Sequence, residues 1–134
     1  MQDKILMVDD EQAVLNVMCD AIERWGYHII CTPNAEDAMT IFLKEKPFLV
    51  LTDLRLYGPV DGALLADRMH RNNPLAIFVA LTGYAQSFGF GHLLGNVFTD
   101  VLLKPVTLSL LKEVIETAHK KHTRWMEYLY GKTD

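Results

Sequence analysis

Short apolar runs alternate with helical patterns along the whole chain. The apolar runs predict five strands, at residues 4–8, 27–31, 48–53, 76–81 and 100–103. After each run, apolar residues recur at three- and four-residue steps and predict helices that begin near residues 11, 34, 61, 84 and 107. Because strand and helix alternate, we expect an α/β fold: a doubly wound, five-stranded parallel sheet with helices on both faces.

Local signals mark several helix boundaries. Gly26 stands where the first helix should be capped, and Asn34 with Asp37 forms a reciprocal cap for the second helix. The predicted fourth helix, residues 84–96, contains three glycines that each cost about 1 kcal/mol relative to Ala, so we expect it to be short or mobile. The apolar face of the first helix is predicted to comprise Ala13, Val14, Val17, Met18, Ala21, Ile22 and Trp25.

A polar residue follows most of the predicted strands. These residues are Asp9, Asp10, Asp53, Thr82 and Lys104. Taken alone, the strand-ending Asp53 is equally well explained as a helix or turn cap. In a parallel sheet, however, all strand carboxyl ends lie at one edge, which is also where ligands bind. We therefore expect the five residues to converge, although they span most of the sequence.

Three converging carboxylates need a compensating cation. Two unit charges 4 Å apart repel by about 4 kcal/mol at an effective dielectric constant near 20. Oxygen ligands without soft neighbours suit Mg²⁺, and Lys104 supplies a second positive charge. A cation, a lysine and a hydroxyl around one carboxylate make a site for phosphoryl transfer, with Asp53 as the nucleophile.

Composition and charge narrow the function classes. The chain has 134 residues, half of them hydrophobic, which fits one domain. Its net charge is −4 and its 13 basic residues are scattered, so direct nucleic-acid binding by this segment is not expected. Cys19 and Cys31 lie in apolar patterns and are expected to be small buried hydrophobes in a reducing cytoplasm. No signal peptide or membrane span is indicated, so we expect a soluble, cytoplasmic protein.

Residues 4–119 resemble the receiver domains of two-component response regulators. The resemblance rests on Asp9-Asp10, on Asp53 within Leu51-Thr52-Asp53-Leu54, on Thr82-Gly83 and on Lys104-Pro105, each at a strand end. It implies a sheet of order 2-1-3-4-5 and a receiver domain over residues 1–121. It also implies that Asp53 is phosphorylated by a sensor histidine kinase or a phosphotransfer protein, with self-catalysed transfer and slow autodephosphorylation.

The resemblance assigns roles to individual residues. Asp10, Asp53 and the backbone carbonyl of Arg55 would bind Mg²⁺ directly, and Asp9 would act through water. Thr82 would bond a phosphoryl oxygen, and Lys104 would pair with the phosphate. The Lys104-Pro105 peptide bond would be cis.

Three positions depart from the family pattern. The loop between Asp53 and Asp61-Gly62 is one residue longer than usual, which puts the place of Arg55 in question. Val101 stands where an aromatic switch residue is usual, so we expect the switch at Thr82 and Val101 to work through displacement of the loop and fourth helix. The apolar segment around Val97-Phe98 is either core or a partner surface, such as a homodimer contact of the fourth helix and fifth strand.

The last predicted helix continues beyond a usual receiver domain. A heptad-like stripe runs through it, formed by Leu108, Leu111, Ile115, Ala118, His122, Trp125 and Leu129. Residues 122–134 could fold back on the domain, pair with a second subunit, or start a linker to an output domain. His119 and His122 lie at i and i+3, but two ligands alone are weak support for a metal site.

Other function classes fit less well. A nucleotide-binding domain of the same fold would need a phosphate loop where Asp9-Asp10-Glu11 stands. A phosphatase with an aspartyl nucleophile would need an acid where Arg55 stands. The remaining alternative is a receiver-like interaction or dimerisation module that is not phosphorylated.

Overall fold

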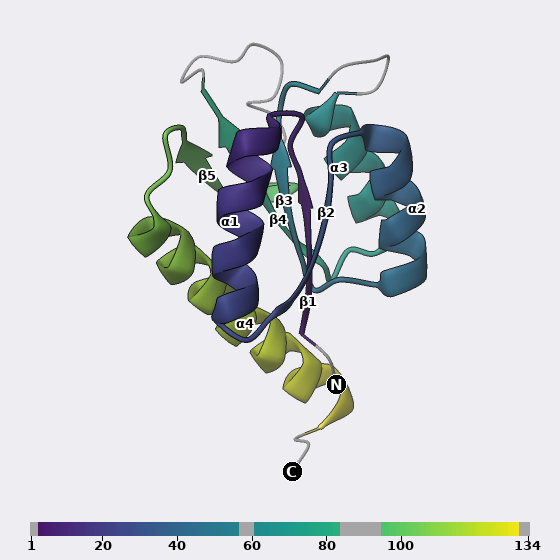
Figure 1. The fold of residues 1–134 in the computed structure, drawn as a ribbon. Coiled ribbons are helices and arrows are strands. Elements are labelled where there is room, and N and C mark those ends of the chain that lie inside the picture. The colour runs from purple at the N-terminus through teal and green to yellow at the C-terminus, as the bar shows by residue number, and fades with distance from the viewer. Residues whose placement is uncertain (1–2, 57–60, 84–94, 132–134) are drawn as a thin grey trace.

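A computed structural model describes residues 3–56, 61–83 and 95–131. Within these residues, five strands and four helices follow one another along the chain (Figure 1). The strands are β1 (Lys4–Val8), β2 (His28–Thr32), β3 (Leu49–Asp53), β4 (Ile77–Thr82) and β5 (Phe98–Leu103). The helices are α1 (Gln12–Arg24), α2 (Ala35–Glu45), α3 (Gly62–Asn72) and α4 (Leu108–Tyr130).

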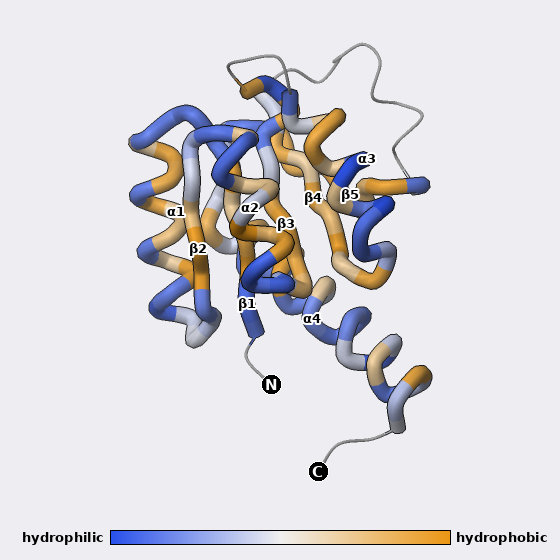
Figure 2. The backbone as a smooth tube through the Cα atoms, turned by 90° about the vertical axis from the view of Figure 1, so that its right-hand side faces the viewer, coloured by the Kyte–Doolittle hydropathy of each residue, from blue (hydrophilic) through white to orange (hydrophobic). Residues whose placement is uncertain are grey.

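The strands form one parallel sheet in the order β2-β1-β3-β4-β5, as predicted. Buried residues of α2 and α3 form one core cluster with one face of the sheet, and those of α1 and α4 form a second cluster with the other face. β3 lies in the middle, and every residue of it is buried. The hydropathy view shows apolar strands enclosed between amphipathic helices (Figure 2).

Side-chain caps fix where three of the helices begin. The side chains of Asn34, Asp61 and Thr107 each accept a hydrogen bond from a backbone N–H in the first turn of α2, α3 and α4 respectively. Gly26 has φ +98°, which glycine adopts at little cost and which suits the turn after α1. The Asn34 cap of α2 is the one that the sequence predicts.

Two element predictions need correction. The buried face of α1 consists of Leu15, Met18, Ala21 and Ile22, whereas Val17 is 58% exposed, so the predicted face was rotated by part of a turn. β5 begins at Phe98, two residues before the predicted start, because Thr99 and Asp100 lie on an edge strand that tolerates polar side chains.

Some predictions about partner surfaces fall outside the described residues. The predicted fourth helix lies largely in residues 84–94, and residues 57–60 of the lengthened loop after Asp53 are likewise outside the described part of the chain. Val97 and Phe98 are described, and both are buried in the core cluster on the α2 and α3 face. These two residues are therefore core, and the homodimer contact of the fourth helix and fifth strand stays a prediction.

The two cysteines do not behave as predicted. Cys19 on α1 and Cys31 on β2 form a disulfide, with their Cα atoms 6.8 Å apart. Both side chains are only partly buried. The expectation of two free buried thiols is thus wrong in this structure. The two cysteines come together through tertiary packing, because α1 packs beside the edge strand β2.

The last helix runs from Leu108 to Tyr130 without a break at residue 121 (Figure 1). Leu111, Ile115 and Ala118 are buried under the sheet, and Trp125 still packs partly against the same cluster. Tyr128 and Tyr130 are exposed. Among the described helices, none is both long and apolar enough to span a membrane.

Candidate functional site

The predicted polar residues lie at one edge of the sheet. Asp9 and Asp10 follow β1, Asp53 ends β3, Thr82 ends β4 and Lys104 follows β5. The parallel registers place these ends side by side, with Val8 opposite Thr52, Asp53 opposite Leu81 and Thr82 opposite Leu103.

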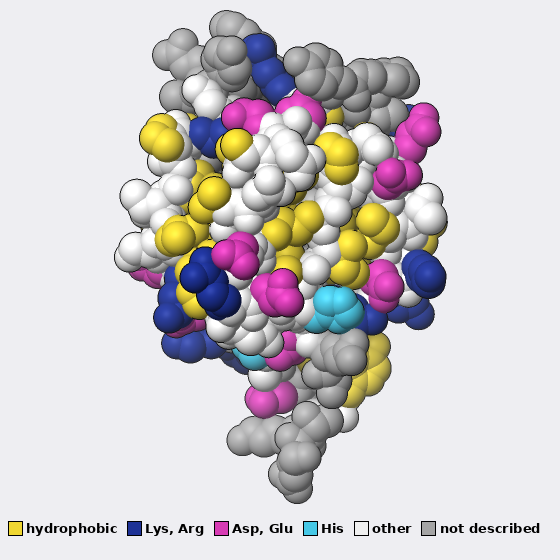
Figure 3. Space-filling model, viewed as in Figure 1, with side chains coloured by type: hydrophobic (Ala, Val, Ile, Leu, Met, Phe, Trp, Pro, Cys, Tyr) yellow, Lys and Arg dark blue, Asp and Glu magenta, His cyan; other side chains and the backbone are white. Residues whose placement is uncertain are grey.

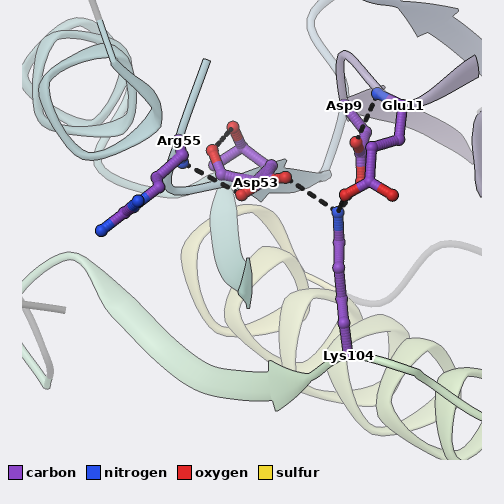
Figure 4. A network of polar contacts seen from close by, with 6 residues as sticks. Asp9, Glu11, Asp53, Arg55 and Lys104 are labelled. Atoms are coloured by element: carbon purple, nitrogen blue, oxygen red, sulfur yellow. Dashed lines mark hydrogen bonds and ion pairs between the residues drawn. The ribbon is translucent and has the colours of Figure 1, made fainter. Parts of the chain in front are cut away.

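Lys104 is the electrostatic centre of this edge. Its Nζ lies 2.7 Å from Asp9 Oδ2, 2.8 Å from Asp53 Oδ2 and 3.0 Å from Glu11 Oε1 (Figure 4). Burial lowers the pKa of Lys104, but its close contacts with the carboxylates of Asp53, Asp9 and Glu11 outweigh it and hold the pKa well above its usual value. The ammonium group is therefore charged throughout the ordinary pH range.

Asp9 is a fully buried carboxylate with an incomplete set of partners. Its Oδ1 accepts a hydrogen bond of 2.9 Å from the backbone N–H of Glu11. Among the described residues, its Oδ2 has the ion pair with Lys104 but no partner of hydrogen-bonding geometry. Desolvation raises the pKa of Asp9 above its usual value, although the nearby ammonium of Lys104 and the hydrogen bond from Glu11 oppose that shift. Burial thus disfavours the ionised form of Asp9 in spite of Lys104, and a further positive charge nearby would stabilise it.

Three carboxylates are placed to share a cation. Asp9, Asp10 and Asp53 each offer one oxygen, and these oxygens lie within 4.8 Å of one another. Carboxylate oxygens suit Mg²⁺, and the Oδ2 of Asp9 without a hydrogen-bond donor is a suitable place for a cation or its water. The residues present therefore fit a magnesium ion.

The two carboxylate oxygens of Asp53 have different partners, one on the backbone and one on a side chain. Its Oδ1 accepts a hydrogen bond of 3.0 Å from the N–H of Arg55, while its Oδ2 meets Lys104. Behind it, α3 begins at Gly62, where an added Cβ would lie only 1.6 Å from the carbonyl oxygen of Asp53. Only glycine fits there. Sequence reasoning used Gly62 merely as a helix start, because nothing local indicates this approach.

The other predicted residues are placed as follows. Thr82 is buried, and its carbonyl accepts a hydrogen bond of 2.8 Å from the N–H of Lys104. Val101 lies opposite Ala80 and is partly buried on the α2 and α3 face. The Lys104-Pro105 peptide bond is cis. The carbonyl of Arg55 as a metal ligand stays a prediction.

An apolar cleft of about 690 Å³ opens beside this edge. Glu11, Gly83 and Lys104 lie at its polar part, and α1 contributes its wall with Ala13, Val14, Val17 and Met18. In the space-filling view, apolar side chains are exposed on this side of the molecule (Figure 3). The exposed side chain of Val17, which sequence reasoning assigned to the core, belongs to this cleft.

The family of the chain follows from the comparison with known domains. The model of the response regulator receiver domain matches residues 5–116. The chain belongs to this family. Receiver domains are the signalling phosphoacceptor domains of two-component response regulators, so the resemblance seen in the sequence is confirmed.

The similar proteins include two that are named as transcriptional regulators and one that is named as a phosphotransferase. The chain is 31% identical over 78 residues to "Probable transcriptional regulator ycf27" of Porphyra purpurea and 28% identical over 138 residues to YesN of Bacillus subtilis. It spans 32% and 37% of the lengths of these two proteins. It is also 30% identical over 86 residues to "Sporulation initiation phosphotransferase F" of Bacillus subtilis, covering 64% of this chain and 68% of that protein.

Solved receiver structures share the fold. The crystal structure of NtrX from Brucella abortus superimposes with a TM-score of 0.88 at 23% identity, covering all of this chain and 31% of that one. A receiver domain from Clostridium thermocellum gives a TM-score of 0.84 at 22% identity, covering 92% of this chain and 98% of that one. At such identities the likeness concerns the receiver fold.

Proposed function

We propose that this receiver domain is a phosphorylation-dependent switch that accepts a phosphoryl group on Asp53. The observation that carries the proposal is the position of Asp53 at the end of β3, with Lys104 Nζ 2.8 Å from its Oδ2 and two further acids beside it. The donor is a sensor histidine kinase or a phosphotransfer protein. The name of the sporulation phosphotransferase among the relatives supports phosphoryl transfer as the chemistry.

In the proposed step, an oxygen of Asp53 attacks the phosphorus in line. A bond forms between this oxygen and phosphorus, the bond to the donor nitrogen breaks, and its electron pair stays with the donor histidine. The ammonium of Lys104 pairs with the negative phosphoryl oxygens, and the hydroxyl of Thr82 donates a hydrogen bond to one of them. Because β-strand ends hold these groups, little reorganisation is needed during transfer.

Asp9, Asp10 and Asp53 would hold Mg²⁺, together with the backbone carbonyl of Arg55. The bound ion supplies positive charge that offsets the repulsion among the carboxylates and the incoming phosphoryl group. We place Asp9 in contact through water, which agrees with its depth and with its Oδ2 lacking a hydrogen-bond donor.

The response would pass through Thr82 and the segment that follows it. Val101 is too small to swing between two sites as an aromatic ring does, so the phosphorylated state would be read through displacement of the backbone after β4. Partner proteins include the donor, for which the apolar cleft beside Lys104 is a suitable docking surface. A homodimer through the fourth helix and fifth strand, or through the end of α4, remains part of the proposal.

Intact mass after incubation with a small acyl phosphate and Mg²⁺ tests the proposal. We expect the wild type to gain one phosphoryl group, Asp53→Asn to gain none, and Asp20→Asn, an exposed acid of α1, to behave as the wild type. A wild type that gains no mass would contradict the proposal and favour the interaction module that is not phosphorylated.

A further inference from the structure

Lys104 has one carboxylate partner that lies outside the cation cluster. An ammonium group has three N–H donors, and here three carboxylates surround it. Asp9 and Asp53 belong to the acids that can share a cation, whereas Glu11 does not. Glu11 is thus the only one of the three partners of Lys104 whose contact does not compete with metal binding.

The backbone directs Glu11 to this contact. Glu11 is the N-cap of α1, its N–H donates to Asp9 Oδ1, and its carbonyl accepts from Leu15 at 3.1 Å. Its side chain makes no capping hydrogen bond and instead reaches the ammonium of Lys104 (Figure 4). The contact joins residues 93 positions apart, from the start of α1 to the end of β5.

The partners of Lys104 change during the proposed reaction. Once Asp53 has formed its bond to phosphorus, it has no carboxylate charge left for Lys104. Asp9 is the other buried partner, and it is needed near the cation. Of the three carboxylates, Glu11 alone can then stay with the ammonium group.

We propose that Glu11 is a positioning residue that holds Lys104 at the edge of the site while Asp9 and Asp53 turn to the cation and the phosphoryl group. This inference rests on the proposed function of Asp53. Without Glu11, Lys104 is shared between Asp9 and Asp53 alone and competes more strongly with the cation for both.

Two consequences follow for Glu11→Gln, which keeps the side-chain length and removes the charge. Mg²⁺ binding weakens about fivefold, because the metal must displace a more tightly held ammonium group. The rate constant for phosphorylation by a small acyl phosphate at saturating Mg²⁺ falls about tenfold, because Lys104 is no longer placed before the attack. Glu23→Gln, which removes an exposed acid from the same helix, leaves both quantities within twofold of the wild type, about the size of a screened surface charge effect.

A double-mutant cycle of Glu11→Gln and Lys104→Met decides whether Glu11 acts through Lys104. Mg²⁺ affinity is measured by calorimetry on the full chain, after circular dichroism has shown that each variant is folded. We expect the fivefold effect of Glu11→Gln to fall below about twofold in the Lys104→Met background. If Glu11→Gln lowers the Mg²⁺ affinity equally in both backgrounds, the charge of Glu11 acts on the metal directly and not through Lys104. That result would overturn the proposal.

Metal binding keeps this test separate from the test of Asp53. If the wild type binds Mg²⁺ and shows the coupling but gains no phosphoryl group, the proposed function fails and the placing of Lys104 by Glu11 stands as a feature of the metal site. If the wild type is phosphorylated and the cycle shows no coupling, only the role of Glu11 fails.

Discussion

Gly62 decides how closely α3 can approach the proposed acceptor. A methyl group there would lie 1.6 Å from the carbonyl oxygen of Asp53, and both sides of that contact are backbone. Backbone cannot move aside as the end of a flexible side chain can. An alanine at this position must therefore push α3 away from β3 or shift Asp53 itself.

We predict that Gly62→Ala lowers the free energy of unfolding by about 1–3 kcal/mol, the usual cost of forced overpacking. It should also slow phosphorylation of Asp53, because the acceptor moves relative to Lys104. Urea unfolding and intact mass against time measure the two effects. Gly83→Ala is the matched control for stability, since an added Cβ there meets no atom of the described residues within 4 Å. Equal stability of the two variants would contradict the close approach.

At the scale of single residues, the sequence revealed the polar residues of the site but not Gly62 and Glu11, which contact them in the fold. Asp9, Asp10, Asp53, Thr82 and Lys104 could be found because each follows an apolar run, and parallel strands bring such ends together. Gly62 lies against Asp53 and Glu11 contacts Lys104, and each of these pairs comes together only when the chain folds. No local spacing could have identified those two roles.

At the scale of elements, α1 shows that apolar periodicity can locate a helix without predicting which of its faces is buried. The three- and four-residue steps located the helix correctly, yet Leu15 and not Val17 faces the core. A helix with apolar residues on more than half of its surface does not specify its own rotation, which depends on what it packs against. The same packing brings Cys19 to Cys31, which the apolar pattern of each segment could not show.

The disulfide ties α1 to the edge strand β2 and predicts a redox-dependent stability. Reduction reopens a loop with a sequence separation of 12, and the entropy regained by the unfolded chain lowers the free energy of unfolding by about 3 kcal/mol. Urea unfolding with and without a thiol reductant measures this change. Cys19→Ala should be insensitive to the reductant. Identical midpoints for the wild type under both conditions, with two free thiols by mass, would show that the bond does not form.

The end of α4 contains a histidine that favours its neutral form. His122 packs against Phe48, with ring centroids 5.6 Å apart, and His119 pairs with Asp3 at 3.2 Å. Burial, together with His119, lowers the pKa of His122 below its usual 6.5, and Asp3 opposes the shift. Below pH 6.5 the unfolded chain therefore takes up a proton at this position that the folded chain resists.

We predict that stability falls as the pH drops from 6.5 toward the lowered pKa of His122. The loss from this residue should stay under about 1 kcal/mol, because its side chain is partly exposed and solvent screens the charge. Urea unfolding at about pH 7.5 and about pH 5.5 measures the change in the free energy of unfolding between the two pH values. The contribution of His122 is the part of this change that His122→Gln removes. His28→Gln, at an exposed position of β2, should leave that part unchanged.

At the scale of the whole molecule, the topology itself creates the electrostatic problem of the site. The order β2-β1-β3-β4-β5 was predictable once strands and helices were seen to alternate and the strand ends resembled a receiver. It places the acids after β1 beside the acid that ends β3, and fully buries Asp9. The raised pKa of Asp9 means that its ionised form is less favourable in the folded chain than in the unfolded one. Folding without a metal therefore concentrates negative charge that Lys104 only partly offsets.

Two opposite changes in stability should follow from this concentration of charge. At neutral pH without metal, Asp9→Asn should raise the free energy of unfolding by on the order of 1 kcal/mol, because it removes a buried charge while Lys104 keeps Asp53 and Glu11. With Mg²⁺ at one hundred times its dissociation constant, the wild type should gain about 2.7 kcal/mol and overtake the variant, whose gain is smaller. Thermal unfolding over a Mg²⁺ series, at ionic strength held constant with KCl, separates specific binding from screening. If Asp9→Asn were less stable than the wild type without metal, the ion pair with Lys104 would outweigh the cost of burying Asp9, and the need for a cation inferred from its environment would be wrong.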